Sequence, residues 1–443
     1  MNAPVVSTEN RRDAGLVRAL GPWGLAAGIF NKIVGAGIFA VPAVLAAALG
    51  ARAPLVFVFC GIAVGAVAIC FAEGGSRIPT SGGVYGYIEA ALGPLAGYVG
   101  GTLLWVGDIL ACGGIAAALA DAAGSITPVH YAPLVRPVVI VGVIGFIALV
   151  NIAGVRHGAR LVAVATAVKL LPLAVFLVAG IGALRLDNFT AAPGPGGSLG
   201  HAVLTALFAA VGMEGALSVS GEVAQPSKTI PKALLLAIAG TTLLYIAIQV
   251  IAQGALGGAL PASHAPLADA MGRVSPALRI LMLAGTALSM IGWIGSDIMA
   301  SPRTWFAFAR DGLMPAVLGR VHPVARTPWV AITGYATVAI ILALTGTFTE
   351  LVVLSALTST ALYIGGCLAA WKLKRAGVAL AGAPLGFPWL TTAMMVGCAG
   401  MVLLIALAQI REILGLLALI GISAAVYLAQ QRFLKPRLIK ASG

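Results

Sequence analysis

The sequence predicts an all-α polytopic membrane protein, and three observations carry this prediction. Hydrophobic residues make up 60% of the 443 positions, whereas charged residues make up only 9%. The mean hydropathy is +1.03, which with this composition excludes an ordinary soluble globular domain. Apolar runs recur along almost the whole chain, and each can supply the roughly 20 helical residues that cross a bilayer core of about 30 Å.

Twelve apolar segments are long enough to be membrane spans. They lie near residues 19–49, 54–76, 88–121, 135–153, 159–184, 200–223, 233–256, 276–308, 329–347, 350–372, 388–408 and 412–431. Residues 1–18 are polar, and the first apolar segment lacks the small-residue cleavage site of a signal peptide. We therefore expect a polar amino-terminal tail that leads directly into the first span.

The 27 basic residues predict the orientation of the spans. If both termini are cytoplasmic, 19 of the 27 lie in cytoplasmic tails and loops and 6 lie outside, while Lys32 and Lys169 fall within spans. This asymmetry follows the positive-inside rule. We expect a multi-pass protein of the cell (inner) membrane with both termini cytoplasmic. The net charge of +13 then reflects topology, and nucleic-acid binding is not expected because no basic soluble domain is present.

No metal and no cofactor is predicted. The five cysteines lie in apolar segments without the paired spacing of a zinc or disulfide site; they are Cys60, Cys70, Cys112, Cys367 and Cys398. The five histidines are scattered singly along the chain, which gives a multi-histidine site little support.

The first span carries an interruption. Its stretch IFNKIVGAGIFAVP, residues 29–42, includes Gly35, Gly37, Pro42 and the charged Lys32 inside a long apolar segment. Glycine and proline weaken a helix interior, so the stretch predicts a break deep in the bilayer. Unpaired backbone groups are tolerated at that depth only where they are buried in protein or line a cavity. The break therefore predicts a binding site, as in transporters with discontinuous spans.

The sixth span repeats this pattern. Residues 207–222, LFAAVGMEGALSVSGE, place Gly212, Gly215 and Gly221 together with the carboxylate of Glu214 in an apolar run. Two interrupted spans separated by five crossings suggest two halves of five spans with inverted topology, because an odd number per half reverses the second half in the bilayer.

Four separated motifs resemble those of the amino acid–polyamine–organocation permeases. They are GAGIF at 35–39, AEGGSRIPTSGGVYGY at 72–87, GMEGALSVSGEVAQPSKTIPKA at 212–233, and SPRTWFAFARDGLMP at 301–315 with VHPVARTP at 321–328. The resemblance covers about the whole chain, and it depends on the order and spacing of the motifs together. It implies the LeuT-type fold, with ten spans in a five-plus-five inverted repeat, two further spans, and alternating access around a midplane site.

With this fold the chain divides into five parts. They are a cytoplasmic tail at 1–18, a first inverted repeat at 19–184, a second inverted repeat at 185–372, two further spans at 373–431 and a cytoplasmic tail at 432–443.

The resemblance assigns the substrate site to the two breaks, and backbone chemistry agrees with it. The amides of Ala36, Gly37 and Ile38 would form the bare amino end of the outer half of span one, which suits a carboxylate. Gly35 and Gly37 would let a ligand approach the backbone closely. The alternative is that these glycines only allow close helix packing, as small residues do throughout membrane bundles.

Carbonyl groups left over at the breaks could accept hydrogen bonds from an ammonium group. They belong to Ile33 on span one and to Phe208, Ala209 and Val211 on span six. A free α-amino acid presents a carboxylate and an ammonium side by side, and therefore matches both sets of groups.

Lys169 lies well inside span five, where a charge costs on the order of 2.5–3.5 kcal/mol on insertion scales. In proton-coupled relatives a lysine on span five lies where sodium-driven relatives bind sodium, between spans one and eight, and the resemblance gives Lys169 that place. Burial disfavours its charged form, so Lys169 could release a proton during transport. A permanent salt bridge or snorkelling of the side chain is the alternative.

Three further intramembrane charges bear on specificity. By resemblance to arginine-exchanging members, Asp108 on span three meets the substrate side chain, and Asp297 on span eight lies on the same pocket. Two carboxylates favour a cationic amino acid or a polyamine, whereas Lys32 could neutralise one of them and leave a pocket for neutral substrates. Cationic and neutral substrates therefore both remain possible. Glu214, beside the second interruption, is expected to be a gate or a helix-packing partner.

We expect a secondary active amino acid transporter whose partners are a small-molecule amino acid, the lipid bilayer and protons. An amino acid or polyamine exchanger without proton coupling is the alternative. An ion channel or a subunit of a proton-translocating complex is the alternative of another class. An enzyme is not expected, because the sequence shows no nucleophile–base or metal constellation. The sequence makes no prediction of oligomeric state.

Overall fold

A computed structural model gives the arrangement of the chain. It describes residues 21–35, 37–78, 83–125, 132–154, 169–190, 198–217, 223–310, 312–379 and 385–441. Ala36, one of the predicted amide donors, lies outside the described residues.

The described residues are helical almost throughout and form no β-strand. The elements are α2 (Pro22–Ile33), α3 (Gly37–Leu49), η1 (Gly50–Arg52), α4 (Pro54–Arg77), α5 (Gly83–Leu92), α6 (Pro94–Ser125), α7 (Ala132–Ala153), a helix at Lys169–Ala183 that ends in η3 (Ile181–Ala183), η4 (Leu186–Thr190), α9 (Leu199–Ala210), α10 (Met213–Ala216), α11 (Pro226–Leu256), η6 (Gly257–Ala262), α12 (Pro266–Gly272), α13 (Pro276–Ala300), α14 (Pro302–Arg310), η7 (Ala316–Gly319), α15 (Trp329–Thr345), α16 (Phe348–Arg375), α17 (Leu390–Ala406) and α18 (Ile410–Ala441).

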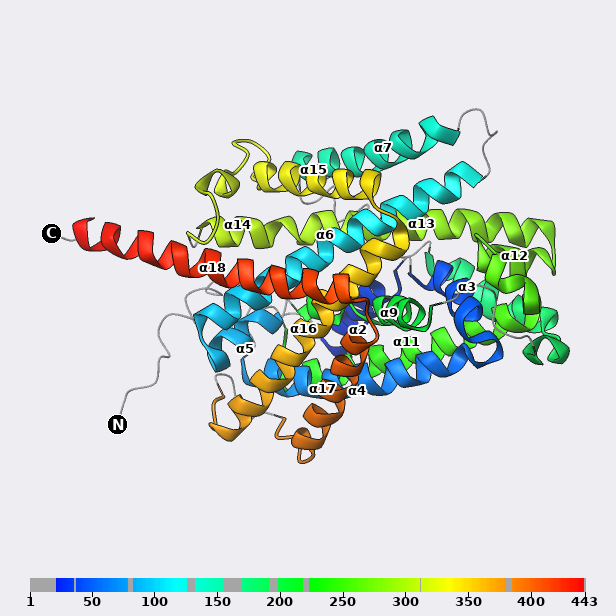
Figure 1. Cartoon of the computed structure of the whole chain (residues 1–443), viewed down its shortest axis with the longest axis horizontal. Coiled ribbons are helices and arrows are strands. Elements are labelled where there is room, and N and C mark those ends of the chain that lie inside the picture. Colours follow the sequence, from blue (N-terminus) through cyan, green and yellow to red (C-terminus); the bar gives the residue numbers. More distant parts are fainter. Residues whose placement is uncertain are drawn as a thin grey trace.

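Within the described residues, seven helices are long and apolar enough to cross a membrane, and the bent pair α2 and α3 brings the number to eight. Four shorter apolar helices lie at Lys169–Ala183, Leu199–Gly215, Trp329–Thr345 and Leu390–Ala406. Several long helices, including α4, α13 and α18, run roughly along the long axis of the molecule (Figure 1). The chain is therefore a multi-pass membrane protein, as its composition predicts.

Both predicted interruptions are present. The axes of α2 and α3 differ by 51°, and α2 ends where the Val34 amide donates to the Phe30 carbonyl. The sixth span divides into α9 and α10, and Gly212 between them has φ +123°. Only glycine adopts this conformation without strain, so the second break is built into the sequence at that position.

The structure moves three predicted span boundaries. The third span begins at Pro94 instead of 88, because Gly93 with φ +96° separates it from the short helix α5. The seventh span begins at Pro226 instead of 233, where proline fits the first turn of α11. The eighth span divides at Ser301, between α13 and α14.

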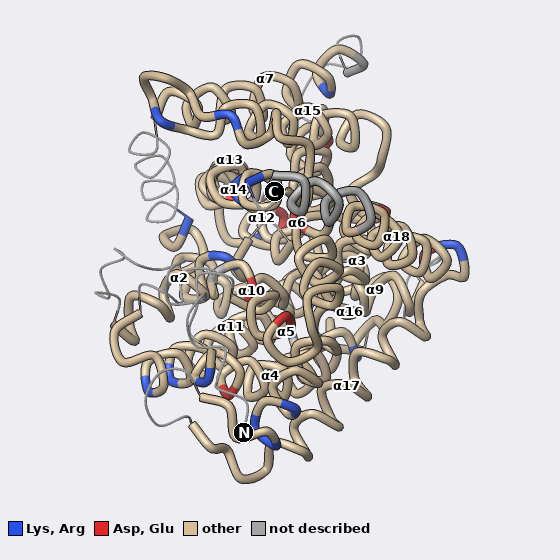
Figure 2. Tube along the Cα trace, turned by 90° about the vertical axis from the view of Figure 1, so that its left-hand side faces the viewer, with Lys and Arg blue, Asp and Glu red and all other residues tan. Residues whose placement is uncertain are grey.

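Loops from separate parts of the chain meet at each of two ends of the molecule. At one end η1, η4 and η6 contact one another. At the other end Tyr98 and Gln430 both donate to the Leu313 carbonyl. Figure 2 shows the molecule from this second end, with basic positions more frequent than acidic ones.

The second end also contains a buried ion pair that ties α4 to the segment after α16. Arg77 lies 2.7 Å from Glu73, and Glu73 is fully buried. The Glu73 carboxylate accepts from the Gly386 and Phe387 amides at 3.3 and 2.8 Å, while Arg77 donates to the Val378 carbonyl at 2.9 Å. The fixed donors around Glu73 explain why a charged pair is tolerated there.

Replacing Glu73 with alanine should destabilise the protein by about 3–5 kcal/mol, because Arg77 would remain buried without its partner. Thermal unfolding of the purified protein in detergent, followed with a thiol-reactive dye that reports exposure of the buried cysteines, would measure the loss. Arg279→Gln is the matched control, because its half-exposed pair with Asp269 should contribute no more than about 1 kcal/mol. Equal melting temperatures for the two variants would contradict this prediction.

Candidate functional site

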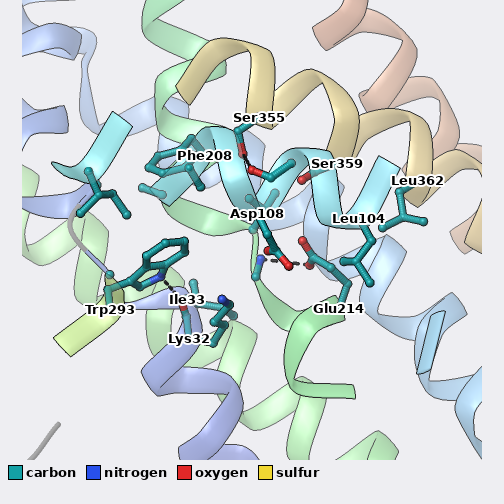
Figure 3. Close-up of a pocket in the computed structure, with 18 residues that line it drawn as sticks. Lys32, Ile33, Leu104, Asp108, Phe208, Glu214, Trp293, Ser355, Ser359 and Leu362 are labelled. Carbon is teal, nitrogen blue, oxygen red and sulfur yellow. Dashed lines mark hydrogen bonds between the residues drawn. The ribbon is translucent and has the colours of Figure 1, made fainter. Parts of the chain in front are cut away.

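A small cavity lies between the two helix breaks. Its walls come from α2, α3, α6, α9, α10, α13 and α16, with Lys32, Asp108 and Glu214 contributing the charges. Figure 3 shows these three side chains reaching toward the same space from different helices. The cavity volume is about 30 Å³, which is room for one or two water molecules. The walls must therefore move apart before a larger ligand can enter.

The first break supplies one wall of the cavity. Gly35 and Gly37 line it, and α3 begins at Gly37, so its first amides form the amino end of a helix beside the cavity. A Cβ atom on Gly35 would lie 2.5 Å from Cδ1 of Trp293. A Cβ atom on Gly37 would lie 3.1 Å from Cβ of Ala209. Both glycines are therefore required for close approach across the site.

The second break is held by a folded-back carboxylate. Glu214 accepts from the Gly212 amide at 3.0 Å and from the Tyr363 hydroxyl at 2.6 Å. Tyr363 lies on α16, so this carboxylate connects α10 to a helix that forms the opposite wall. Glu214, predicted as a gate or packing partner, thus lines the cavity and fixes the geometry of the break.

Tyr245 on α11 joins the two breaks, and no sequence signal marked it. Its hydroxyl lies 2.9 Å from the Ile33 carbonyl and 2.9 Å from the Ala209 carbonyl. The Ile33 carbonyl also accepts from the Gly35 amide at 2.7 Å. The predicted acceptors Ile33 and Ala209 are therefore already engaged by the protein, and an ammonium group would have to share or displace these contacts.

A network of side chains connects the two predicted aspartates. Nζ of Lys32 lies 3.0 Å from Oδ1 of Asp297, and the other oxygen of this carboxylate, Oδ2, accepts from the Tyr335 hydroxyl at 2.6 Å. The Ser301 hydroxyl lies 3.1 Å from Asp297 and 2.7 Å from Asp108. Asp108 lines the cavity, whereas Asp297 is fully buried and reaches the cavity through Lys32. The sequence suggested that Lys32 could neutralise an aspartate, and here its partner is Asp297.

Lys169 lies outside the cavity but contacts the first break directly. Its Nζ donates to the carbonyls of Asn31 and Val34, each at 2.7 Å. The residue is 3% exposed. Its helix also packs against α13, since a Cβ atom on Gly285 would lie 2.3 Å from Pro172. Lys169 is therefore positioned near spans one and eight, with its ammonium on the carboxyl end of α2.

A much larger cavity of about 960 Å³ lies beyond the small one. Both cavities are lined by α3, α6, α9 and α13, but by different parts of these helices. The larger cavity extends to the end of the molecule where α12 lies (Figure 1). Phe208 lines the small cavity and Phe348 lines the large one, with ring centroids 6.4 Å apart. One ring of this aromatic pair therefore lies on the wall of each space.

Most predicted site residues come together at the small cavity. The lining residues among them are Lys32, Ile33, Gly35, Gly37, Asp108, Phe208, Ala209, Val211 and Glu214. Ile38 is buried beside the cavity but does not line it. Asp297 contacts the lining residue Lys32, whereas Lys169 contacts Asn31 and Val34, which do not line the cavity. Sequence reasoning missed Tyr245, Ser301 and Tyr335, because single hydroxyl side chains in apolar helices carry no distinguishing pattern.

No group of three or more His, Cys, Asp or Glu side chains in the described segments is arranged to hold a metal ion. The site instead offers backbone amides, carbonyls and a charged network. These groups suit a small polar ligand that carries both positive and negative charge.

Comparison with known proteins assigns this architecture to a transport family. A family model described as amino acid permease matches residues 20–412. The methylthioribose transporter of Bacillus subtilis is 28% identical over 337 residues, 71% of this chain and 72% of the relative. The serine/threonine exchanger SteT of the same organism is 28% identical over 348 residues, 75% of this chain and 78% of the relative. The uncharacterized transporter Rv1999c of Mycobacterium tuberculosis is 32% identical over 315 residues, 68% of this chain and 67% of the relative.

Proposed function

The chain belongs to the amino acid permease family, within the amino acid–polyamine–organocation superfamily, and from this premise we propose that it is a secondary active transporter of a free α-amino acid. It is a transporter and not an enzyme. The observation that carries the proposal is the pair of helix breaks that face one cavity. A membrane protein tolerates such breaks where their backbone groups meet a polar ligand.

The amino acid binds through its backbone atoms. Its carboxylate lies against the amides at the start of α3, around Gly37 and Ile38, where the helix end carries partial positive charge. Its ammonium group lies against carbonyls of the two breaks, and it competes with the Tyr245 hydroxyl for Ile33 and Ala209. Asp108, which lines the cavity, contacts the side chain of the substrate.

The named relatives bear on the substrate class. One is a serine/threonine exchanger, which supports an amino acid substrate, while another is a methylthioribose transporter, which widens the class to small polar organic molecules. The backbone groups at both breaks favour the amino acid, because a zwitterion satisfies amides and carbonyls together.

Proton coupling is assigned to Lys169. Its ammonium bridges two carbonyls at the carboxyl end of α2. Loss of its proton would remove a positive charge from that helix end and weaken its hold on the break, which links protonation to the position of α2. Exchange without proton coupling is the second candidate, and the exchanger among the relatives favours it.

The proposed architecture has twelve spans. The seven long helices, the bent pair and the four shorter apolar helices correspond in order to the twelve apolar segments of the sequence. We assign the first ten to a LeuT-type five-plus-five inverted repeat, and we assign the end with α14 and the last turns of α18 to the cytoplasm. The large cavity then opens to the outside of the inner membrane, and the Phe208–Phe348 pair closes the substrate site from it.

A competition experiment in proteoliposomes tests the proposal. The twenty amino acids, agmatine, putrescine and methylthioribose would compete with a labelled amino acid, with and without an imposed pH gradient. We expect saturable uptake that one or a few amino acids inhibit, and acceleration by an inward proton gradient. Ion conductance without any amino acid-specific uptake would favour the channel alternative, and acceleration by internal amino acid alone would favour exchange.

A further inference from the structure

We propose that Lys32 excludes cationic side chains from the site by filling the subsite for a cation with its own ammonium group, so that the transported amino acid is small and neutral. This inference depends on the proposed function and adds the substrate class. It assigns to Lys32 a specificity role that goes beyond neutralising a buried aspartate.

The surroundings of the Lys32 ammonium are those of a receptor for an organic cation. Nζ lies 4.3 Å from the ring centroid of Trp293 and 3.0 Å from Oδ1 of Asp297. An aromatic face and a carboxylate together are what binding sites for ammonium and guanidinium ligands offer. Tyr335 and Ser301 hold the Asp297 carboxylate in place through hydrogen bonds. The subsite is therefore rigid and is occupied by the protein itself.

The lysine stem is fixed as firmly as its charged end. The Lys32 carbonyl accepts from Nε1 of Trp293 at 3.1 Å. A Cβ atom on Gly212 would lie 3.4 Å from Cγ of Lys32, and one on Gly215 would lie 3.3 Å from its Cε. The methylene chain thus runs along the two glycines of the second break. A substrate cation could not enter the subsite without displacing both the side chain and its packing against α10.

The remaining walls suit a short side chain without charge. Beyond the charged groups, the cavity is lined by Leu104, Ala111, Phe208, Ser355 and Ser359. A second cation placed in the cavity would lie beside the Lys32 ammonium, and the repulsion between like charges disfavours its binding. Asp108 and Glu214 also line the cavity and already accept hydrogen bonds, from the Ser301 hydroxyl at 2.7 Å and from the Tyr363 hydroxyl at 2.6 Å, and Lys32 is the basic residue of the same wall.

Removing the lysine should open the subsite. In proteoliposomes, arginine, lysine and agmatine would compete with the best neutral substrate, for the wild type and for Lys32→Met, which keeps most of the stem but not the charge. We expect the wild type to prefer the neutral substrate at least tenfold over each cation. In Lys32→Met this ratio should shift at least tenfold toward the cations, because Asp297 and Trp293 become available to them.

A double variant provides the control. Lys32→Met combined with Asp297→Asn removes the carboxylate that would hold the incoming cation, so the shift toward cations should disappear. Replacing both members of a buried ion pair is also tolerated better than removing one of them. If Lys32→Met does not fold, Lys32→Ala is tested by thermal unfolding with added ethylammonium, which should stabilise this variant and leave the wild type unchanged.

Four outcomes separate the inference from the proposed function. Wild-type competition by arginine as strong as by neutral amino acids would overturn the inference, and so would an unchanged ratio in Lys32→Met. A shift that persists in the double variant would overturn the assignment of Asp297 to the subsite. Failure of the wild type to take up any amino acid would instead remove the proposed function, while ethylammonium binding to Lys32→Ala would still decide whether the subsite exists.

Discussion

Replacing Lys169 with glutamine should abolish the pH dependence of transport and lower its rate at least tenfold. Nζ of Lys169 donates to the carbonyls of Asn31 and Val34, and both carbonyls lie at the carboxyl end of α2 beside the break. Glutamine retains a donor for one of them but carries no charge and cannot gain or lose a proton near neutral pH. Initial rates of labelled amino acid uptake, measured across a series of external pH values, would give both quantities.

Two companion variants distinguish the charge from the hydrogen bonds. Lys169→Arg keeps a charge that proteins do not remove, so transport should lose its pH dependence while the variant melts close to the wild type. Lys169→Met removes every donor, so the two carbonyls lose their partner and the variant should melt lower than the glutamine variant. A pH profile in Lys169→Gln that matches the wild type would refute proton coupling through this residue and leave the exchanger alternative.

The helical class and the two helix breaks could be predicted because both depend on local residue composition, which the sequence shows directly. Apolar runs separated by polar loops indicate spans whatever their packing. Glycine, proline and a charge inside such runs mark places where a helix is weak, and α2 and α9 do end at those places. Basic residues gathered in alternate loops predicted the orientation of the spans, which stays a prediction.

The side-chain partners within the site could not be predicted in the same way. Lys32 and Asp297 are 265 positions apart, and no periodicity links two charges that meet only after the fold forms. The two breaks are connected by hydrogen bonds from the Tyr245 hydroxyl. The neighbours of Tyr245 in sequence are apolar, so no motif marks it as a site residue. Pairings across a membrane bundle are set by how the helices pack, which a single sequence does not specify.

Replacing Gly35 with alanine should weaken amino acid binding about tenfold to a hundredfold. The added Cβ would lie 2.5 Å from Cδ1 and 2.8 Å from Nε1 of Trp293, so the indole would have to move. Movement would break its hydrogen bond to the Lys32 carbonyl and its contact with the Lys32 ammonium. Overpacking of this kind costs about 1–3 kcal/mol, and each 1.4 kcal/mol corresponds to about tenfold in affinity.

Gly28→Ala is the matched control, because it lies on the same helix, α2, and a Cβ atom there would meet nothing within 4 Å. Alanine should leave binding unchanged and raise stability by about 0.5–1 kcal/mol, since glycine weakens a helix interior. Substrate-induced shifts in melting temperature would report binding for both variants. If the effect at Gly35 is steric, a smaller residue at 293, as in Gly35→Ala with Trp293→Leu, should recover part of the lost affinity. Equal binding by the two single variants would contradict a contact between the substrate and the first break at Gly35, since Gly35 lines the cavity and Gly28 does not.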